Sequence, residues 1–258
     1  MSSRLSRPQA FLWAGVLAAG VTAAACGGGT TTSQQEAPKP VANPVDPATA
    51  GTVTGHVTLD GTPPPNQPIK TASDPNCKAA ITTQTFVVGD GGSLANVFVY
   101  VKDGLGNRVF PVPTQSVVLG QKDCQYTPHV LGIQVGQTLD MISSDPTLHN
   151  VHGGDRDTAN REFNFGQGIP GVKNSHVFST KEVVFPFSCD VHKWMKAYLG
   201  IVDNPFYAVT GTDGSFSLKG LPPGTYTIEA VHEKAGRQTQ TVTIGQKETK
   251  DISFAFKV

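Results

Sequence analysis

Apolar and polar residues alternate in short stretches along most of the chain after residue 50. Over Thr52–Leu59 an apolar residue or Gly occupies every second position, and the stretch ends at a run rich in Gly and Pro, residues 60–65. A period of two is typical of a strand with one buried face, and Gly and Pro runs form turns. The pattern therefore predicts a strand that ends in a turn.

The C-terminal part repeats this texture of short strands and tight turns. Its turn sequences include Thr-Asp-Gly at 212–214 and Leu-Pro-Pro-Gly at 221–224, which match the residue preferences of tight turns. No apolar stripe with the helical period follows residue 25, and the chain contains 28 Gly and 19 Pro. We therefore predict an all-β protein. Besides the first strand, strands are expected near 97–101, 206–210, 216–218, 226–231 and 239–244.

The first residues of the chain follow the order of a secretory signal. Arg4 and Arg7 precede an apolar run at residues 10–21, and three alanines lead to Cys26. The apolar run is too short to span a bilayer durably. We therefore expect an exported protein with a signal peptide over residues 1–25.

The residues around Cys26 resemble a bacterial lipobox, with Ala23 where a lipobox usually carries Leu or Val. The resemblance implies that Cys26 is acylated and anchors the protein to a membrane on its periplasmic side. Residues 26–50, rich in Gly, Thr, Gln and Pro, would then form a disordered tether. Simple cleavage that releases a soluble protein is the alternative.

The number of cysteines bears on metal binding. Of the four cysteines, Cys26 is set aside, so three thiols remain in an oxidising compartment and one must stay unpaired or bind something. Only Cys189 has a His and a Met close behind it. We therefore expect a disulfide between Cys77 and Cys124. A bridge from Cys124 to Cys189 is the alternative.

The segment between residues 113 and 205 carries a set of metal-ligating residues. A predicted strand at 183–188 leads directly into Cys189, and the spacing Cys-x2-His-x2-Met adds His192 and Met195 on one short loop. His149 lies about 40 residues upstream and supplies a second imidazole. A His2Cys plane with a weak axial Met is the blue-copper arrangement. The sequence therefore predicts one type 1 copper site.

Other metal centres fit these residues less well. Structural zinc sites use more Cys or His and no Met. An iron–sulfur cluster or a c-type haem needs more cysteines than the chain offers. A binuclear copper centre would need a second Cys close to Cys189, and the sequence has none there.

The segments 148–152 and 189–195 resemble the two copper-ligand segments of the cupredoxins, the amicyanin and plastocyanin-like blue copper proteins. The resemblance covers about 70 to 90 residues and implies a Greek-key β-sandwich that carries single electrons. It departs from the family at Lys193-Trp194, where a Pro-aromatic pair is expected, and at the late start of the return strand. The copper ligands that it implies are His149, Cys189, His192 and Met195.

The same resemblance assigns roles around the ligands. Asn150 would hydrogen-bond across to the ligand loop, and the exposed ring edge of His192 would be the port for electrons. Trp194 would either join a docking patch or pack inward, and Met195 has a buried core position as its alternative. His152 is not a ligand in that pattern. We expect structural roles for His129, His176 and His232.

Residues 212–226 resemble the turn motifs of the carboxypeptidase regulatory-like β-sandwich over about 50 residues. In that family the opening strand reads like residues 51–64 of this chain. The resemblance implies a second, smaller sandwich without catalytic residues, built from 51–112 together with 206–258. The copper domain, 113–205, would then be nested within it. Two consecutive domains are the alternative.

The expected function is one-electron transfer in the periplasm, without catalysis. The partner would be a periplasmic redox protein such as a c-type cytochrome or a dehydrogenase. Lys plus Arg and Asp plus Glu both number 20, so the formal net charge is zero and nucleic-acid binding is not expected. The alternatives are a copper-delivery lipoprotein and a metal-free β-sandwich adhesion module.

Replacing Cys26 by Ser tests the lipid anchor. Serine cannot be acylated as a lipobox cysteine is, so the variant should leave the membrane fraction and appear in the soluble periplasmic fraction. Immunoblots of the two fractions measure this. Unchanged fractionation of Cys26→Ser would contradict the lipoprotein interpretation.

Overall fold

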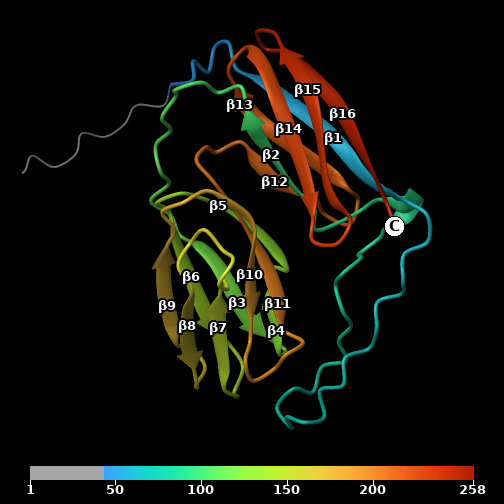
Figure 1. Cartoon of the computed structure of the whole chain (residues 1–258), viewed down its shortest axis with the longest axis vertical. Helices are drawn as coiled ribbons and strands as arrows, with labels where there is room; N and C mark the ends of the chain where they lie inside the picture. Colours follow the sequence, from blue (N-terminus) through green and yellow to red (C-terminus); the bar gives the residue numbers. More distant parts are fainter. Residues whose placement is uncertain (1–43) are drawn as a thin grey trace, which may run out of the picture. The chain divides into compact units, whose positions relative to one another are not determined.

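The computed structural model describes residues 44–258, and the predicted signal peptide, Cys26 and most of the predicted tether lie outside them. The regular secondary structure of the described residues consists almost entirely of strands (Figure 1). Their one helical element is the 3-10 turn η1 (Asp90–Gly92). Within residues 44–258 no helix combines the length and hydropathy needed to cross a bilayer. The predicted all-β class is confirmed.

Two sheets take their strands from both ends of the described chain, with strand orders β13-β1-β16 and β12-β2-β14-β15. Their inner faces share one core, in which alternate residues of β1 are buried as its period of two predicts. The strands are β1 (Gly51–Asp60), β2 (Phe98–Asp103), β12 (Tyr207–Val209), β13 (Ser215–Leu221), β14 (Gly224–His232), β15 (Gly236–Ile244) and β16 (Thr249–Lys257).

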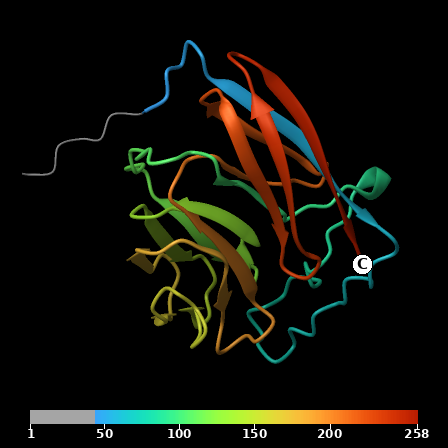
Figure 2. The same cartoon turned by 45° about the horizontal axis from the view of Figure 1, so that its top comes forward.

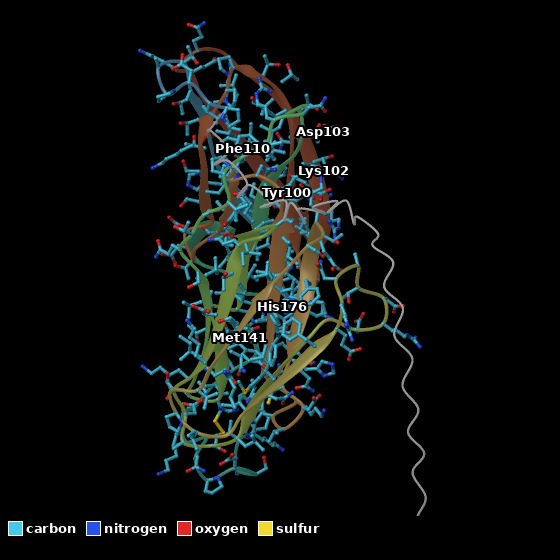
Figure 3. All side chains as sticks on the ribbon, turned by 90° about the vertical axis from the view of Figure 1, so that its left-hand side faces the viewer. Tyr100, Lys102, Asp103, Phe110, Met141 and His176 are labelled. Carbon is cyan, nitrogen blue, oxygen red and sulfur yellow. A yellow bond between two sulfur atoms is a disulfide. The ribbon has the colours of Figure 1, made fainter. Side chains whose placement is uncertain are left out.

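Two further sheets come from the residues in between, with orders β5-β11-β10-β7-β8 and β4-β3-β6-β9. They enclose a second core, in which Met141 of β6 is fully buried (Figure 3). The strands are β3 (Val117–Lys122), β4 (Gln125–Thr127), β5 (Val130–Gln134), β6 (Thr138–Ser143), β7 (His149–Gly153), β8 (Phe163–Gln167), β9 (Lys173–Val177), β10 (Glu182–Ser188) and β11 (Lys196–Val202).

The strands of residues 51–103 and 207–257 thus share sheets, whereas those of 117–202 form sheets of their own. By their contacts the described residues, 44–258, belong to a single compact unit. The division into independent domains at residues 112 and 206 therefore stays a prediction. We call the sheets of 117–202 the inner sandwich and the other two the outer sandwich.

The connection from β1 to β2, residues 61–97, is long and contains no strand; we call it the strap (Figure 2). Its backbone is held by η1 and by isolated bridges such as Pro68 with Thr82. A disulfide joins Cys77 of the strap to Cys124 in the turn between β3 and β4. This is the pair expected from the number of cysteines, and Cys189 is left as a free, buried thiol.

Two glycines allow aromatic rings of the outer sandwich to lie against β5 and β11. Gly132 and Gly200 are register partners in this parallel pair. A Cβ on Gly200 would lie 2.3 Å from Phe98 Cζ, and a Cβ on Gly132 would lie 2.4 Å from Tyr207 Cε2. Both distances are far below van der Waals contact. The missing side chains therefore leave the space that the two rings fill.

Gly200→Ala should destabilise the protein, because the added methyl group would displace Phe98 in a closely packed region. Overpacking of this kind typically costs about 1–3 kcal/mol. Urea denaturation would measure the loss. Gly166→Ala is the matched control, since a Cβ on this strand glycine meets nothing within 4 Å. Equal stability of the two variants would contradict the packing argument.

Candidate metal centre

Three of the predicted ligands converge at one end of the inner sandwich. His149 is the first residue of β7, and Cys189 directly follows the last residue of β10. These strands are antiparallel neighbours, so the start of β7 and the end of β10 lie at the same end of the sheet. The loop between β10 and β11 then adds His192.

The ligand atoms of these three residues face one another. His149 Nδ1 lies 2.9 Å from His192 Nδ1, and His192 Nδ1 lies 4.0 Å from Cys189 Sγ. Potential ligand atoms of the three residues all lie within 4.8 Å of one another. Each residue is buried, so water has little access to the space between them.

The ligand loop closes on itself through its backbone. The His192 N–H points to Cys189 Sγ at 3.3 Å, the Met195 N–H donates to the His192 carbonyl, and the Cys189 N–H donates to the Met195 carbonyl. Met195 is buried in the same core cluster as Cys189. The structure therefore brings Met195 to the closing end of the loop, and its role as an axial ligand stays a prediction.

Asn150 bridges the two ligand segments. Its Oδ1 accepts the backbone N–H of Asp190 at 2.6 Å and lies 3.3 Å from Cys189 Sγ. Its Nδ2 donates to Asp190 Oδ2 and to Asn164 Oδ1. The Tyr126 hydroxyl donates to the Asn150 carbonyl. These bonds are the contacts across to the ligand loop that the cupredoxin resemblance implies.

A carboxylate lies behind each of the two histidines. Asp145 Oδ2 is 2.9 Å from His149 Nε2, and Asp74 Oδ2 is 3.1 Å from His192 Nε2. An ionised carboxylate can only accept, so each Nε2 carries a proton. In a neutral ring the lone pair then lies on Nδ1, which is the form that binds a metal. Such carboxylate–histidine pairs orient metal-ligating rings and fix their tautomer.

Both carboxylates are themselves held by hydrogen bonds. Asp145 accepts the backbone N–H groups of Asp123 and Cys124, each at 2.8 Å. Asp74 accepts the hydroxyl of Thr147 and the backbone N–H of Asn76. These bonds, Thr147 first, lower the pKa of Asp74 to about 2. Asp74 is therefore ionised at neutral pH.

The expected exposure of His192 is wrong. Only 2% of its surface is exposed, because the strap lies over the ring: Asp74 contacts Nε2, and Cys77 Sγ lies 3.8 Å from the same atom. Trp194 lies beside the ring, with centroids 4.9 Å apart. Its Nε1–H donates to the Cys124 carbonyl, which favours the inward-packed alternative for Trp194.

The sequence analysis missed both aspartates. Asp145 lies four residues before His149 in the turn that leads to β7, a spacing that could have marked it as a partner of this histidine. Asp74 is separated from His192 by more than a hundred residues, and the strap shows no periodicity that would locate it. No local signal was available for Asp74.

The remaining histidines of the middle of the chain have other partners. His129 Nε2 is hydrogen-bonded to Glu233 Oε1 at 2.8 Å. His176 stacks on Phe163, and burial lowers its pKa. His152 contacts Glu162 and Asp190, and the bond to Glu162 is the main reason why its pKa is raised. None of these three belongs to the cluster of potential ligands around Cys189.

Comparisons with known proteins find likeness only among solved structures. No protein-family model matches the sequence, and no curated protein matches it. The copper-containing nitrite reductase from Thermus scotoductus SA-01 aligns over 40% of this chain and 26% of its own, with 16% identity and a TM-score of 0.33. Two variants of amicyanin also align, each over 35% of this chain and 85% of its own, with a TM-score of 0.31. One is a Cu(I) form in which a methionine is replaced by alanine, and it is 18% identical to this chain. The other is a reduced form in which a tryptophan is replaced by tyrosine, and it is 19% identical. The match spans about a quarter of the reductase, and none of these likenesses says what this chain binds.

Proposed function

We propose that this protein binds one type 1 copper ion and carries single electrons. The observation that supports this most strongly is the 2.9 Å separation between His149 Nδ1 and His192 Nδ1. Both rings hold their proton on Nε2, so two lone pairs face each other. Two lone pairs at this distance repel unless a cation lies between them. The arrangement therefore suits a metal ion that both imidazoles share with Cys189.

The donor atoms fit copper better than other common metals. A thiolate and a thioether are soft ligands that favour copper, and imidazole suits both of its oxidation states. His149, Cys189 and His192 would form the plane of the site, and Met195 would be the weak axial ligand. Structural zinc sites do not use methionine.

A bound copper ion would supply a one-electron couple between Cu(I) and Cu(II). The residues around it act by limiting movement and excluding water. Asn150 ties the segment of His149 to the loop of Cys189, and the two aspartates keep both imidazoles in one orientation. A site that barely moves between oxidation states exchanges electrons quickly, and its hydrogen bonds and dryness adjust the potential.

The buried ligands favour electron transfer over copper delivery. A delivery protein hands its ion to a partner by exchanging ligands, which requires that partner ligands reach the metal. Here His149, Cys189 and His192 are all enclosed. An electron needs no such opening. The proposed partner is a periplasmic redox protein such as a c-type cytochrome or a dehydrogenase, and the proposed location is the membrane surface, through Cys26.

Cys189→Ser should abolish the visible colour of the copper-loaded protein. Within residues 44–258, Cys189 is the free cysteine, and a thiolate is needed for the charge transfer to Cu(II) that produces an intense blue band. His149→Ala and His192→Ala should each weaken or shift the band, because they open a position in the plane to water. Absorption spectra of purified, copper-loaded proteins measure this. His56→Ala, which removes an exposed histidine of β1, is the control, and a colourless wild type would overturn the proposed site.

Met195→Leu should keep the colour and raise the reduction potential. Leucine fills a similar volume but removes a weak donor that stabilises Cu(II). Cyclic voltammetry of the wild type and the variant measures the shift. If colour and potential both stay unchanged, Met195 is a core residue and the copper has three protein ligands.

A further inference from the structure

We propose that Asp74 is a positioning residue for the metal site: from the strap it holds His192 so that Nδ1 faces the metal position. This inference rests on the proposed function, because it takes His192 as a ligand. It gives the strap a role in the metal site, although the strap supplies none of the proposed ligands.

The carboxylate of Asp74 accepts a hydrogen bond from Nε2 of the buried His192 ring, the nitrogen that faces away from the metal position. Asp74 Oδ2 lies 3.1 Å from His192 Nε2, and the side chain of His192 is 3% exposed. Water can therefore not replace the carboxylate as the partner of this N–H. A buried N–H without a partner is costly, so the ring is stable only in the orientation that points Nε2 at Asp74. That orientation turns Nδ1 toward His149 and Cys189.

Asp74 is anchored independently of His192. Its own N–H donates to the Thr71 carbonyl, and its carbonyl accepts the N–H of Cys77, three residues later. Cys77 is tied to Cys124 by the disulfide. The hydroxyl of Thr147, next to the turn that leads to His149, donates to the same carboxylate oxygen that contacts His192. The strap therefore presents Asp74 from a fixed position.

The restraint applies to the more exposed of the two imidazoles. His149 begins a strand and is flanked by β-ladder bonds to β8, whereas His192 lies on the loop between β10 and β11. Without Asp74, rotation of the His192 ring away from the metal would break no hydrogen bond at Nε2. With Asp74 in place, the same rotation breaks a charge-assisted hydrogen bond. Asp74 should therefore retain the metal and shield the ring.

Two substitutions of similar size can distinguish a hydrogen bond that orients the His192 ring from a side chain that merely covers it. Asp74→Asn keeps an acceptor oxygen at this place, and Asp74→Leu fills the same space without one. Loss of a partner behind a metal ligand typically weakens metal affinity about 10–100-fold. We expect Asp74→Leu to lose copper from the reduced, copper-loaded protein to a Cu(I) chelator at least about ten times faster than wild type. Asp74→Asn should stay within about threefold of wild type, because hydrogen bonding is kept. Asp90→Leu, an exposed aspartate of the strap, is the control.

A second measurement needs no copper. The metal-free proteins are treated with diethyl pyrocarbonate, and peptide mass mapping follows modification of His192. His192 should react faster in Asp74→Leu than in wild type, Asp74→Asn or Asp90→Leu. Thermal unfolding and non-reduced mass mapping establish that the variants are folded with Cys77 and Cys124 paired. Where Asp74→Leu does not fold, Thr147→Val, which removes the other partner of this carboxylate, should show a smaller change in the same direction.

The outcomes distinguish this inference from the proposed function. Equal rates of copper loss and of His192 modification in Asp74→Leu and Asp90→Leu would overturn the role of Asp74. If Asp74→Leu and Asp74→Asn change copper loss and His192 modification equally, only the charge of Asp74 matters. That result would also overturn positioning by the hydrogen bond. A colourless wild type whose His192 still becomes reactive in Asp74→Leu would overturn the copper function alone.

Discussion

The structure depends on holding two imidazole nitrogens face to face in a buried space. His149 Nδ1 and His192 Nδ1 are 2.9 Å apart, with the thiol of Cys189 beside them. Such an arrangement is unfavourable without a cation, because the lone pairs repel and no solvent screens them. Everything around the cluster restrains these rings: a carboxylate behind each Nε2, Asn150 between the segments and a loop closed by its own backbone.

These restraints come from distant parts of the chain. Asn150 belongs to β7 and Asp145 to the turn before it, so both lie near His149 in the sequence. Asp74 reaches His192 from the strap, which starts and ends in the outer sandwich. Gly132 and Gly200 let rings of the outer sandwich lie against β5 and β11. The outer strands therefore contribute to the site through the strap that they anchor, although they supply none of the proposed ligands.

Features that depend on residues close together in the sequence could be predicted from it. The period of two predicted the strand at Thr52–Leu59, and the spacing after Cys189 predicted which residues meet on the ligand loop. It failed for His192, whose ring edge was expected at the surface. The covering residues lie more than a hundred positions earlier in a segment without periodicity, and only the folded chain brings them together. The role of Gly132 and Gly200 could likewise not be predicted from the sequence, because these glycines act through the space that they leave for Phe98 and Tyr207.

The order of the cysteines along the chain has a consequence for how the protein matures. Cys77 and Cys124 both precede Cys189, so the proposed export from the N-terminus would present the two bridging thiols before the third emerges. An early bridge removes the competitors with which Cys189 could pair by thiol–disulfide exchange. The same bridge ties the strap to the β3–β4 turn. In the proposed periplasmic location, chain order would thus keep one thiol reduced without a dedicated protecting factor.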